Sequence, residues 1–534
     1  MTKVISFAEA VGRIASGSTI TICASAGMMV PEKTLAALEE RYLQTGEPNN
    51  LTVFFPIAIG DRISIPGLDH LAHVGMIKRL IGGSYVLGRS DGSGNKIARM
   101  VLNDQVEAYN LPLGTMFHML RDTAAGKPGT FTEVGLDTFV DPRITGGKLN
   151  RVTTEDLIEV VTLGGREYLW YKPVPIDVAI IRATTADENG NLSFEHEPGT
   201  LGILSQATAA KNNGGIVIAQ VERVTTDGRL NPHMVKVPGA MVDAVVVDPD
   251  QMLGTQIPRD PALSGETRRP LHEFERMPFA VNKVIARRAA MEFRPGMIVN
   301  LGFGIPGHIP QIAIEEDIAD QVCMIIEQGS WGGIPVSGLA FGASANPQSI
   351  IDSGSQMDFI DGGGIDLACL AFGEVAQDGT INVSKLGKLI PGCGGFINIV
   401  HNAPKLVFCG YFTAGGLEAE VVDGEMVIHK EGRFRKFVRE VEQITYRGRS
   451  MVARGKDVIF VSERAVFSLI PDGLQLIEVA PGIDVRSQIL DLMQFPVVVS
   501  GELKQMDERL FRPEPMGLGV GYSSAQRPSL VVER

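Results

Sequence analysis

The sequence lacks any apolar stretch as long as the roughly 18 residues that a membrane helix needs. Its first residues, MTKVISFAEAVGRI, hold no sustained apolar run of signal-peptide length. We therefore expect a soluble, cytoplasmic protein with no membrane partner.

Blocks of basic residues are also missing, and the formal net charge is −13. A nucleic-acid-binding surface or a polybasic membrane patch needs a local excess of Lys and Arg. We therefore expect no nucleic-acid partner. Net charge does not exclude an anionic small molecule, because glycine-loop amides and a few basic side chains bind phosphate in an acidic protein.

Cysteines are few, and no C-x-x-C pair or His partner stands at metal-ligand spacing. The nine histidines show no catalytic or ligand spacing either. We predict no metal site, and we predict reduced thiols, mostly buried, at Cys23, Cys323, Cys369, Cys393 and Cys409.

What the chain does have is enough apolar sequence for a large core. Hydrophobic residues make up 44% of its 534 residues and charged residues 21%, with 61 glycines and 30 prolines. This composition is typical of a globular α/β protein, and the length exceeds that of one ordinary domain. We start from two domains.

Short β-rich runs alternate with helix-like stretches and glycine turns, which favours parallel sheets. The predicted strands include Thr19–Cys23, Val178–Ile181, Ile216–Val221 and Ala244–Val247. The stretch from Asp248 to Pro278 holds five prolines and little apolar periodicity, so it is interpreted as a linker. The predicted division is an N-terminal domain 1–250, a linker 251–278, a C-terminal domain 279–520 and a tail 521–534.

The two halves repeat one plan. A helix over Phe7–Ser16, a glycine, a strand and a small-residue loop recur as a helix over Val281–Phe293, Gly296, a strand over Ile298–Leu301 and the loop after it. A second match is Ile176-Asp177-x-Ala179 before a turn at Gly190, and Ile365-Asp366-x-Ala368 before a turn at Gly379, both at an offset of 189 residues. Two matches in the same order favour tandem related domains.

Glu327 follows the short apolar run Cys323–Ile326. In open α/β sheets the carboxyl ends of strands face the ligand site, so a carboxylate there is well placed for chemistry. A lone Glu at a strand end is more often a capping or ion-paired residue. Glu327 therefore needs support from its surroundings.

Three glycine-rich elements in the same half supply some support: Gly302-x-Gly304-x-Pro306, Gly362–Gly364 and Gly392–Gly395. Amides in such loops bind phosphate or stabilise an oxyanion, since glycine has no Cβ to block approach. The same residues serve ordinary turns, and Gly362–Gly364 is the best candidate for a purely structural role.

Taken together, these segments resemble the class I coenzyme A transferases, and within them the single-chain propionate and acetate CoA-transferases. The resemblance covers nearly the whole chain. It is carried, in order, by Gly126–Gly129, Gly135–Pro142, Gly214–Val221, Val299–Pro306, Glu327–Gly329, Phe341–Ser344, Gly362–Leu367, Asn382–Lys385, Gly392–Asn398 and Ala480–Asp484.

The resemblance implies two tandem open α/β domains facing each other across a crevice, with Glu327 as the catalytic nucleophile. It implies oxyanion-stabilising amides at Gly394 and Gly395. The coenzyme A contacts that it implies, with a possible phosphate partner in Lys385, are Gly302, Phe303, Gly304, Ile305, Pro306, Asn382, Lys385 and Gly392.

Two positions depart from the family pattern. The loop Ala24–Met29 has less glycine than relatives carry, and Leu113 stands where the family often has Gln. A Gln amide would reach the reacting carboxylate or the substrate, so its absence bears on oxyanion binding by the N-terminal half.

The implied activity is ping-pong transfer of CoA between a short-chain acyl-CoA and a free acid of the acetate or propionate type, through a glutamyl-CoA thioester. No cofactor beyond CoA is expected, and the resemblance implies a homo-oligomer, with a tetramer as the expected form. The alternatives are a CoA thioesterase on the same fold, and a sugar-phosphate isomerase-like or binding protein. A nicotinamide dehydrogenase fits poorly, because neither Gly302-x-Gly304 nor Gly392-x-Gly394 completes G-x-G-x-x-G.

Overall fold

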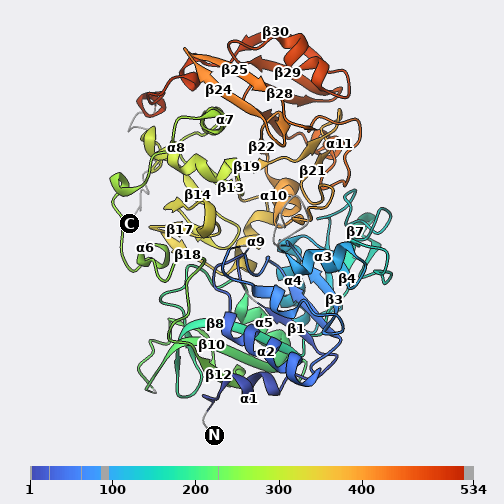
Figure 1. Cartoon of the computed structure of the whole chain (residues 1–534), viewed down its shortest axis with the longest axis vertical. Helices are drawn as coiled ribbons and strands as arrows, with labels where there is room; N and C mark the ends of the chain where they lie inside the picture. Colours follow the sequence, from blue (N-terminus) through green and yellow to red (C-terminus); the bar gives the residue numbers. More distant parts are fainter. Residues whose placement is uncertain (1–2, 23, 62, 86–94, 227, 522–534) are drawn as a thin grey trace.

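The computed structural model describes residues 3–22, 24–61, 63–85, 95–226 and 228–521. Two large mixed sheets, each flanked by helices, occupy the two ends of the long axis (Figure 1). Cys23 lies outside the described residues, and so does the predicted tail, 521–534, apart from Gly521.

The N-terminal sheet has nine strands, and its seven central strands are all parallel in the order β12-β10-β8-β1-β2-β3-β4. The antiparallel strands β9 and β11 extend it beside β8. The strands are β1 Thr19–Ile22, β2 Leu51–Phe55, β3 Ile77–Gly82, β4 Glu107–Asn110, β8 Val178–Asp187, β9 Leu192–Ser193, β10 Ile216–Thr225, β11 Val235–Val237 and β12 Ala244–Val247.

The C-terminal sheet has ten strands in the order β18-β15-β14-β13-β19-β22-β27-β28-β29-β30. Its central five, from β14 to β27, are parallel. The strands are β13 Ile298–Leu301, β14 Cys323–Ile325, β15 Ser330–Trp331, β18 Ser349–Ile350, β19 Leu367–Ala371, β22 Lys405–Cys409, β27 Asp457–Val461, β28 Ala465–Ile470, β29 Gly473–Val479 and β30 Val498–Gln505.

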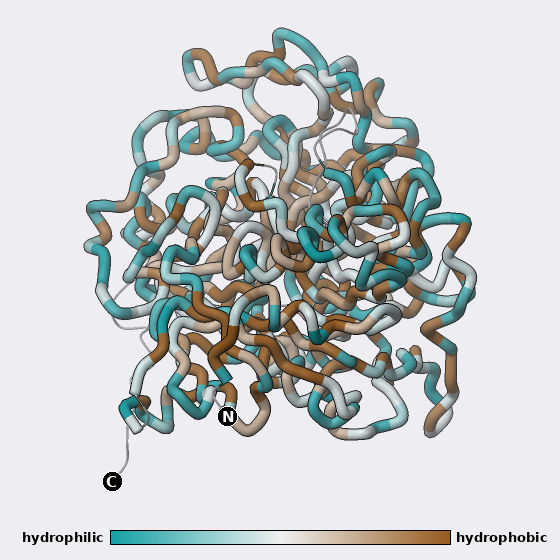
Figure 2. The backbone as a smooth tube through the Cα atoms, turned by 60° about the horizontal axis from the view of Figure 1, so that its bottom comes forward, coloured by the Kyte–Doolittle hydropathy of each residue, from teal (hydrophilic) through white to brown (hydrophobic). Residues whose placement is uncertain are grey.

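Helices cover the sheets, and the backbone is most hydrophobic inside the molecule, with hydrophilic segments prominent at its edges (Figure 2). The helices are α1 Phe7–Gly12, α2 Glu32–Thr45, α3 Lys96–Leu102, α4 Leu113–Ala124, α5 Ile203–Asn212, α6 Pro261–Ser264, α7 Val281–Ala290, α8 Ile309–Glu315, α9 Ser353–Asp361, α10 Phe396–Asn402, α11 Gly448–Ala453 and α12 Val485–Gln488. α4 packs on α9 and α10, so these three helices join the halves (Figure 1).

Both halves also contain smaller sheets of two or three strands. They comprise β5 Thr130–Thr132, β6 Ile158–Leu163, β7 Arg166–Tyr171, β16 Ile334–Pro335, β17 Ser344–Ala345, β20 Glu374–Val375, β21 Ile381–Asn382, β23 Thr413–Ala414, β24 Glu418–Val422, β25 Glu425–Lys430 and β26 Phe434–Arg435. Of these, β20 pairs with β21 and β23 pairs with β26, next to the carboxyl ends of β19 and β22.

The internal repeat is visible in the strand order. The series β12-β10-β8-β1-β2 and β27-β22-β19-β13-β14 are both parallel and run in the same sense along the chain. The matched aspartates make the same contact: an Asp177 carboxylate oxygen accepts the Thr19 N–H at 2.8 Å, and an Asp366 oxygen accepts the Ile298 N–H at 2.8 Å. This confirms two related open α/β domains.

Some predicted boundaries are wrong. The first helix ends at Gly12 rather than Ser16, in part because glycine favours the helix poorly. The Arg41 guanidinium also donates hydrogen bonds to the carbonyls of Val11 and Ile14, at 2.5 and 2.7 Å, so these carbonyls are satisfied without further helix. Strand β8 runs six residues and strand β10 four residues past its predicted end, since the two strands continue to pair with each other as far as Asp187 and Thr225.

The predicted linker contributes no strand to either large sheet, but it is packed rather than loose. Leu253 and Leu263 are buried, the Leu253 carbonyl accepts the Met29 N–H at 2.9 Å, and the Ala262 carbonyl accepts the Asn346 N–H at 2.8 Å. The segment therefore touches both halves. The exact domain boundaries stay a prediction.

The described cysteines are free thiols. Cys369, Cys393 and Cys409 are buried, and burial raises the pKa of Cys409 to about 12; Cys323 is half-buried. Within the described ranges, no helix is both long and apolar enough to cross a membrane.

Candidate active site

Glu327 lies two residues beyond β14, at the carboxyl edge of the C-terminal sheet. The chain turns back at once into β15, and Gly329 makes that turn with φ 119°. A side chain at Gly329 would collide with the Ile351 carbonyl, so the turn requires glycine. The turn holds Glu327 at the strand end, as predicted.

The Glu327 carboxylate has no charged partner. Among the described residues, no hydrogen bond or ion pair reaches it, although it is half-buried. Burial removes water from the carboxylate and raises the pKa of Glu327 to about 7. Within the described residues, Glu327 therefore lacks the hydrogen bonds and ion pairs that a capping or ion-paired Glu makes.

Gly395 lies against that carboxylate. A Cβ built on Gly395 would lie 3.2 Å from Cδ and 3.3 Å from Oε2 of Glu327. The Gly395 N–H donates no hydrogen bond within the described part of the chain. The absence of a side chain at Gly395 therefore lets main chain and carboxylate approach each other.

The neighbouring amides of the same loop are already engaged with the N-terminal half. The Cys393 N–H donates to Oδ1 of Asn110 at 2.8 Å, and the Gly394 N–H donates to the Gly83 carbonyl at 2.8 Å. The Leu113 N–H in turn donates to the Gly394 carbonyl at 2.9 Å. Gly394 is therefore an anchoring residue in this structure, and Gly395 carries the open amide.

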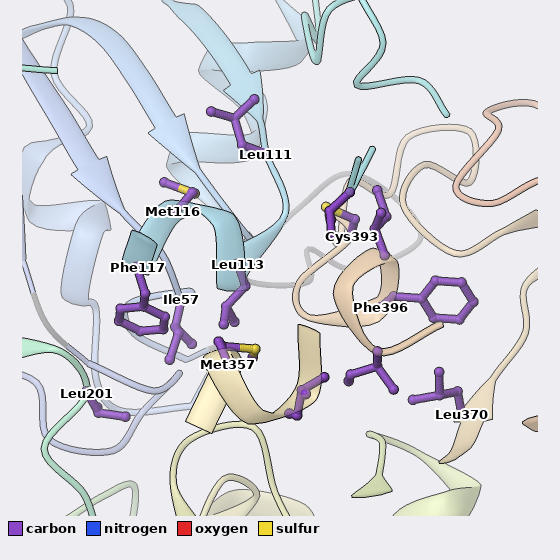
Figure 3. Packing of buried hydrophobic residues seen from close by; sticks show 14 of the residues in the cluster. Ile57, Leu111, Leu113, Met116, Phe117, Leu201, Met357, Leu370, Cys393 and Phe396 are labelled. Carbon is purple, nitrogen blue, oxygen red and sulfur yellow. The ribbon is translucent and has the colours of Figure 1, made fainter. Parts of the chain in front are cut away.

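Leu113 joins this junction by its backbone and by its side chain. It opens α4 and is almost fully buried. Figure 3 shows it near Met357 of α9, with Cys393 and Phe396 in the same cluster of buried residues from both halves. Where the family often has a Gln amide, this chain has an apolar contact.

Asn398, one turn along α10 from Gly395, holds the two halves together at this junction by hydrogen bonds. Its Oδ1 accepts the Gly114 N–H at 3.0 Å, and its Nδ2 donates to both carboxylate oxygens of Asp361 at 3.0 and 3.1 Å. Burial raises the pKa of Asp361. These side-chain contacts of Asn398 and Asn110 were not predicted from the sequence, although Asn398 is the last residue of the family-like stretch Gly392–Asn398.

The Gly302–Pro306 loop lies at the carboxyl end of β13, the strand next to β14. Gly302 is buried and its N–H donates to the Cys369 carbonyl at 2.9 Å, whereas Phe303 and Gly304 are exposed. Gly304 has φ 87° and open space where a Cβ would be. The tip of this loop is therefore accessible on the same edge as Glu327.

Asn382 and Lys385 lie in the segment that leads to the Gly392 loop. Asn382 is buried and uses its side chain within that segment, donating to Oε2 of Glu374 at 2.8 Å and to the Lys385 carbonyl at 2.6 Å. The Lys385 ammonium is 3.5 Å from a Glu442 carboxylate oxygen. The structure thus shows framework contacts for both, and their contact with coenzyme A stays a prediction.

Three kinds of comparison with known proteins relate this chain to coenzyme A transferases. The family profile for coenzyme A transferase matches residues 4–248. The acetate CoA-transferase YdiF of Escherichia coli K12 is 43% identical over 96% of this chain and 96% of its own. The caffeate CoA-transferase of Acetobacterium woodii is 42% identical over 97% of this chain and 99% of its own.

Among solved structures, a thioester complex of the acyl-CoA transferase YdiF of E. coli O157:H7 with CoA has a TM-score of 0.89 and 41% identity, and each chain covers 97% of the other. The two open α/β domains and this similarity over nearly the whole chain define an acyl-CoA-dependent transferase. This chain belongs to the coenzyme A transferase family. It is a transferase that moves CoA between an acyl-CoA and a carboxylic acid.

Proposed function

We propose that this enzyme exchanges CoA between short-chain acyl-CoAs and free acids of the acetate or propionate type, through a thioester on Glu327. The observation that carries the proposal is the half-buried Glu327 carboxylate, which has no partner among the described residues and has Gly395 against it. The name of the acetate CoA-transferase relative and the thioester complex of its O157:H7 counterpart support the same chemistry.

In the first step, the Glu327 carboxylate attacks the thioester carbonyl. The carbon–sulfur bond breaks, giving a mixed anhydride and a CoA thiolate. A carboxylate is a weak nucleophile in water, but proximity and the loss of its hydration raise its reactivity in a dry site. The burial that raises the pKa of Glu327 is the same desolvation.

In the second step, the thiolate attacks the glutamyl carbonyl of the anhydride. The donor acid leaves as its carboxylate, and Glu327 becomes a CoA thioester. The acceptor acid then reverses both steps, so donor product leaves before acceptor binds and the kinetics are ping-pong. The Gly395 N–H, which has no hydrogen-bond acceptor among the described residues, would stabilise the oxyanion of each addition.

The decisive experiment is to incubate the enzyme with an acyl-CoA and no acceptor acid. We expect the peptide that contains Glu327 to gain the mass of CoA, and borohydride to reduce that thioester to an alcohol. Glu327→Gln should lower exchange by roughly 10³-fold or more, because the amide cannot act as this nucleophile. Glu316→Gln is a suitable control, since Glu316 accepts the Met516 N–H at 2.7 Å, far from this edge.

Two outcomes would reject the mechanism: a folded Glu327→Gln enzyme that exchanges CoA at the normal rate, or a wild-type enzyme that never forms the adduct. Rapid release of free acid and CoA without an acceptor would instead indicate a thioesterase. That result would mean that water reaches the glutamyl intermediate.

Further expectations accompany this proposal. Glycines 302 and 304 and their neighbours, with Asn382, Lys385 and Gly392, stay candidate coenzyme A contacts. A homo-oligomer, a cytoplasmic location and the absence of other cofactors also stay predictions. Within the described residues, no three His, Cys, Asp or Glu side chains gather at metal-ligand spacing.

A further inference from the structure

Lys436 reaches the same sheet edge as Glu327 from a distant segment. It directly follows β26, whose partner β23 continues the chain beyond β22. Its Nζ lies 3.9 Å from the ring centroid of Phe372, just past β19, and a Cβ on Gly410, just past β22, would lie 2.6 Å from Nζ. The ammonium therefore lies between the carboxyl ends of β19 and β22.

No group of opposite charge neutralises this ammonium. Within the described residues, no carboxylate comes within 4 Å of Nζ and no carbonyl accepts a hydrogen bond from it. Lys436 is half-buried, and its nearest acidic influence, Glu463, is paired with Arg464 at 2.7 Å. Burial lowers the pKa of Lys436 to about 7.

The surrounding segment is basic in an acidic protein. Arg433, Arg435 and Arg439 flank Lys436, and none of the three has a carboxylate within 4 Å among the residues that the structure describes. Arg433 stacks on Phe434 and donates to the Gly415 carbonyl at 3.2 Å. Three arginines without a carboxylate within 4 Å in the described residues create a positive potential around Lys436 despite the net charge of −13.

The strand order gives the distance from the nucleophile. β14, β13, β19 and β22 are successive neighbours, and strands are about 4.8 Å apart, so Lys436 lies about 10–14 Å along the edge from Glu327. A small acid held at Glu327 does not span that distance. A long substrate that lies along the edge does, and the exposed tip of the Gly302–Pro306 loop lies between the two positions.

We propose that Lys436 binds a phosphate of coenzyme A, and thereby sets the affinity for the acyl-CoA rather than for the acid. A phosphate supplies the counter-charge that the ammonium lacks, in a position remote from the reacting carbon. The proposal rests on the proposed function for the identity of the ligand. It assigns Lys436 to substrate binding and not to bond making.

A purely structural lysine looks different, as Lys456 shows. Lys456 is also half-buried, and burial lowers its pKa to about 8, but its Nζ donates to the Ala403 carbonyl at 2.6 Å. It precedes β27 and so lies at the amino end of the sheet, opposite to Glu327. Lys456 therefore provides a matched control.

The test is equilibrium binding of CoA and of pantetheine, which lacks the phosphates, to wild type, Lys436→Met and Lys456→Met. Met keeps the apolar stem on Phe372 and removes the charge. We expect Lys436→Met to weaken CoA binding about tenfold. Pantetheine binding should be unchanged, as should both affinities in Lys456→Met. In exchange assays, KM for acetyl-CoA should rise and KM for acetate should stay the same.

Unchanged CoA affinity in Lys436→Met, or equal weakening of CoA and pantetheine, would overturn the proposal. If that variant does not fold, Gly410→Ala serves instead, because its methyl group displaces Nζ without altering the lysine. It should weaken CoA and not pantetheine, and no selective weakening there would also overturn the proposal. Binding needs no turnover, so a failed adduct experiment at Glu327 leaves this test interpretable.

Discussion

At the scale of single residues, Glu327 bears a charge that the folded chain does little to stabilise. The folded pKa of about 7 lies above the ordinary value of 4.5, so the folded protein holds this proton more tightly than the unfolded chain does. The contribution of Glu327 to stability is then greatest below pH 4.5, falls as pH rises to about 7, and is constant above that. The ionised Glu327 carboxylate therefore destabilises the fold at neutral pH.

This linkage predicts that Glu327→Gln is more stable than wild type at pH 8, by about 1–3 kcal/mol. The difference should shrink to less than about 1 kcal/mol at pH 5, since the carboxyl is then protonated in the fold and only the unfolded chain has begun to lose its proton. Thermal unfolding at both pH values measures this.

Glu478→Gln supplies the opposite case, because the Glu478 carboxylate accepts two hydrogen bonds from Arg288 at 2.9 and 2.7 Å. That variant should be less stable than wild type at pH 8. A Glu327→Gln protein that melts below wild type at pH 8 would contradict the account of an unpaired carboxylate.

The sequence identified Glu327 because its signal is local: an apolar run, a carboxylate and a glycine turn. Lys436 gave no such signal, since the run from Arg433 to Arg439 has the charge pattern of a solvated surface. Its burial depends on Phe372, 64 positions away, and on Gly410, which belongs to another strand end. Contacts of that kind depend on the tertiary fold.

At the scale of elements, the loop before α10 lies against the Glu327 carboxylate and is also hydrogen-bonded to the N-terminal half. Gly394 has φ 51° and its N–H is bonded to Gly83, so a β-branched residue there would strain the backbone as well as block a ligand. Gly395 has φ −80°, which any residue adopts. Gly395 is therefore the cleaner position at which to test the loop.

Gly395→Ala should lower the turnover number about 10- to 100-fold, because its methyl group displaces the Glu327 carboxyl by a fraction of an ångström. Thermal stability should be little changed. Rates of exchange and of adduct formation, together with a melting curve, test this. Gly12→Ala at the end of α1 is the control, with open space for its methyl group; equal turnover in both variants would refute the role of Gly395.

Strand bounds were predictable from the sequence where the apolar run and the pairing with a neighbouring strand end at the same residue, as in β12 and β13, whose observed bounds match the predicted ones. They were not predictable where pairing continues beyond the apolar run. Strand β10 continues through Glu222–Thr225 because β8 lies beside it. The bonds of Cys393 and Gly394 were also beyond sequence reasoning. Their partners, Asn110 and Gly83, lie in the other half.

At the scale of the whole molecule, each large sheet takes all its strands from one half of the chain. The halves are then joined by the junction around α4, α9 and α10 and by the covalent link near Pro258 and Arg259, which are exposed. The peptide bond that links the two halves should therefore not be required for their assembly or for activity.

We predict that residues 1–258 and 259–534, produced together as two chains, copurify and exchange CoA at a rate within about tenfold of the intact enzyme. Each chain alone should be inactive, because Glu327 and its Gly395 loop depend on Asn110 and Gly83. Copurification and exchange assays measure this. A pair that remains separate, or an active second chain on its own, would show that the junction is not what assembles the site.

The shared aspartate contacts of Asp177 and Asp366 have a consequence for how such a chain changes over generations. Both sheets keep the same internal bond, yet the carboxyl end of β2 leads into Pro56 and Ile57, where the end of β14 leads to Glu327. A duplicated ancestor would need its reactive group in one copy only. The matching position in the other copy is then free to change without touching that group.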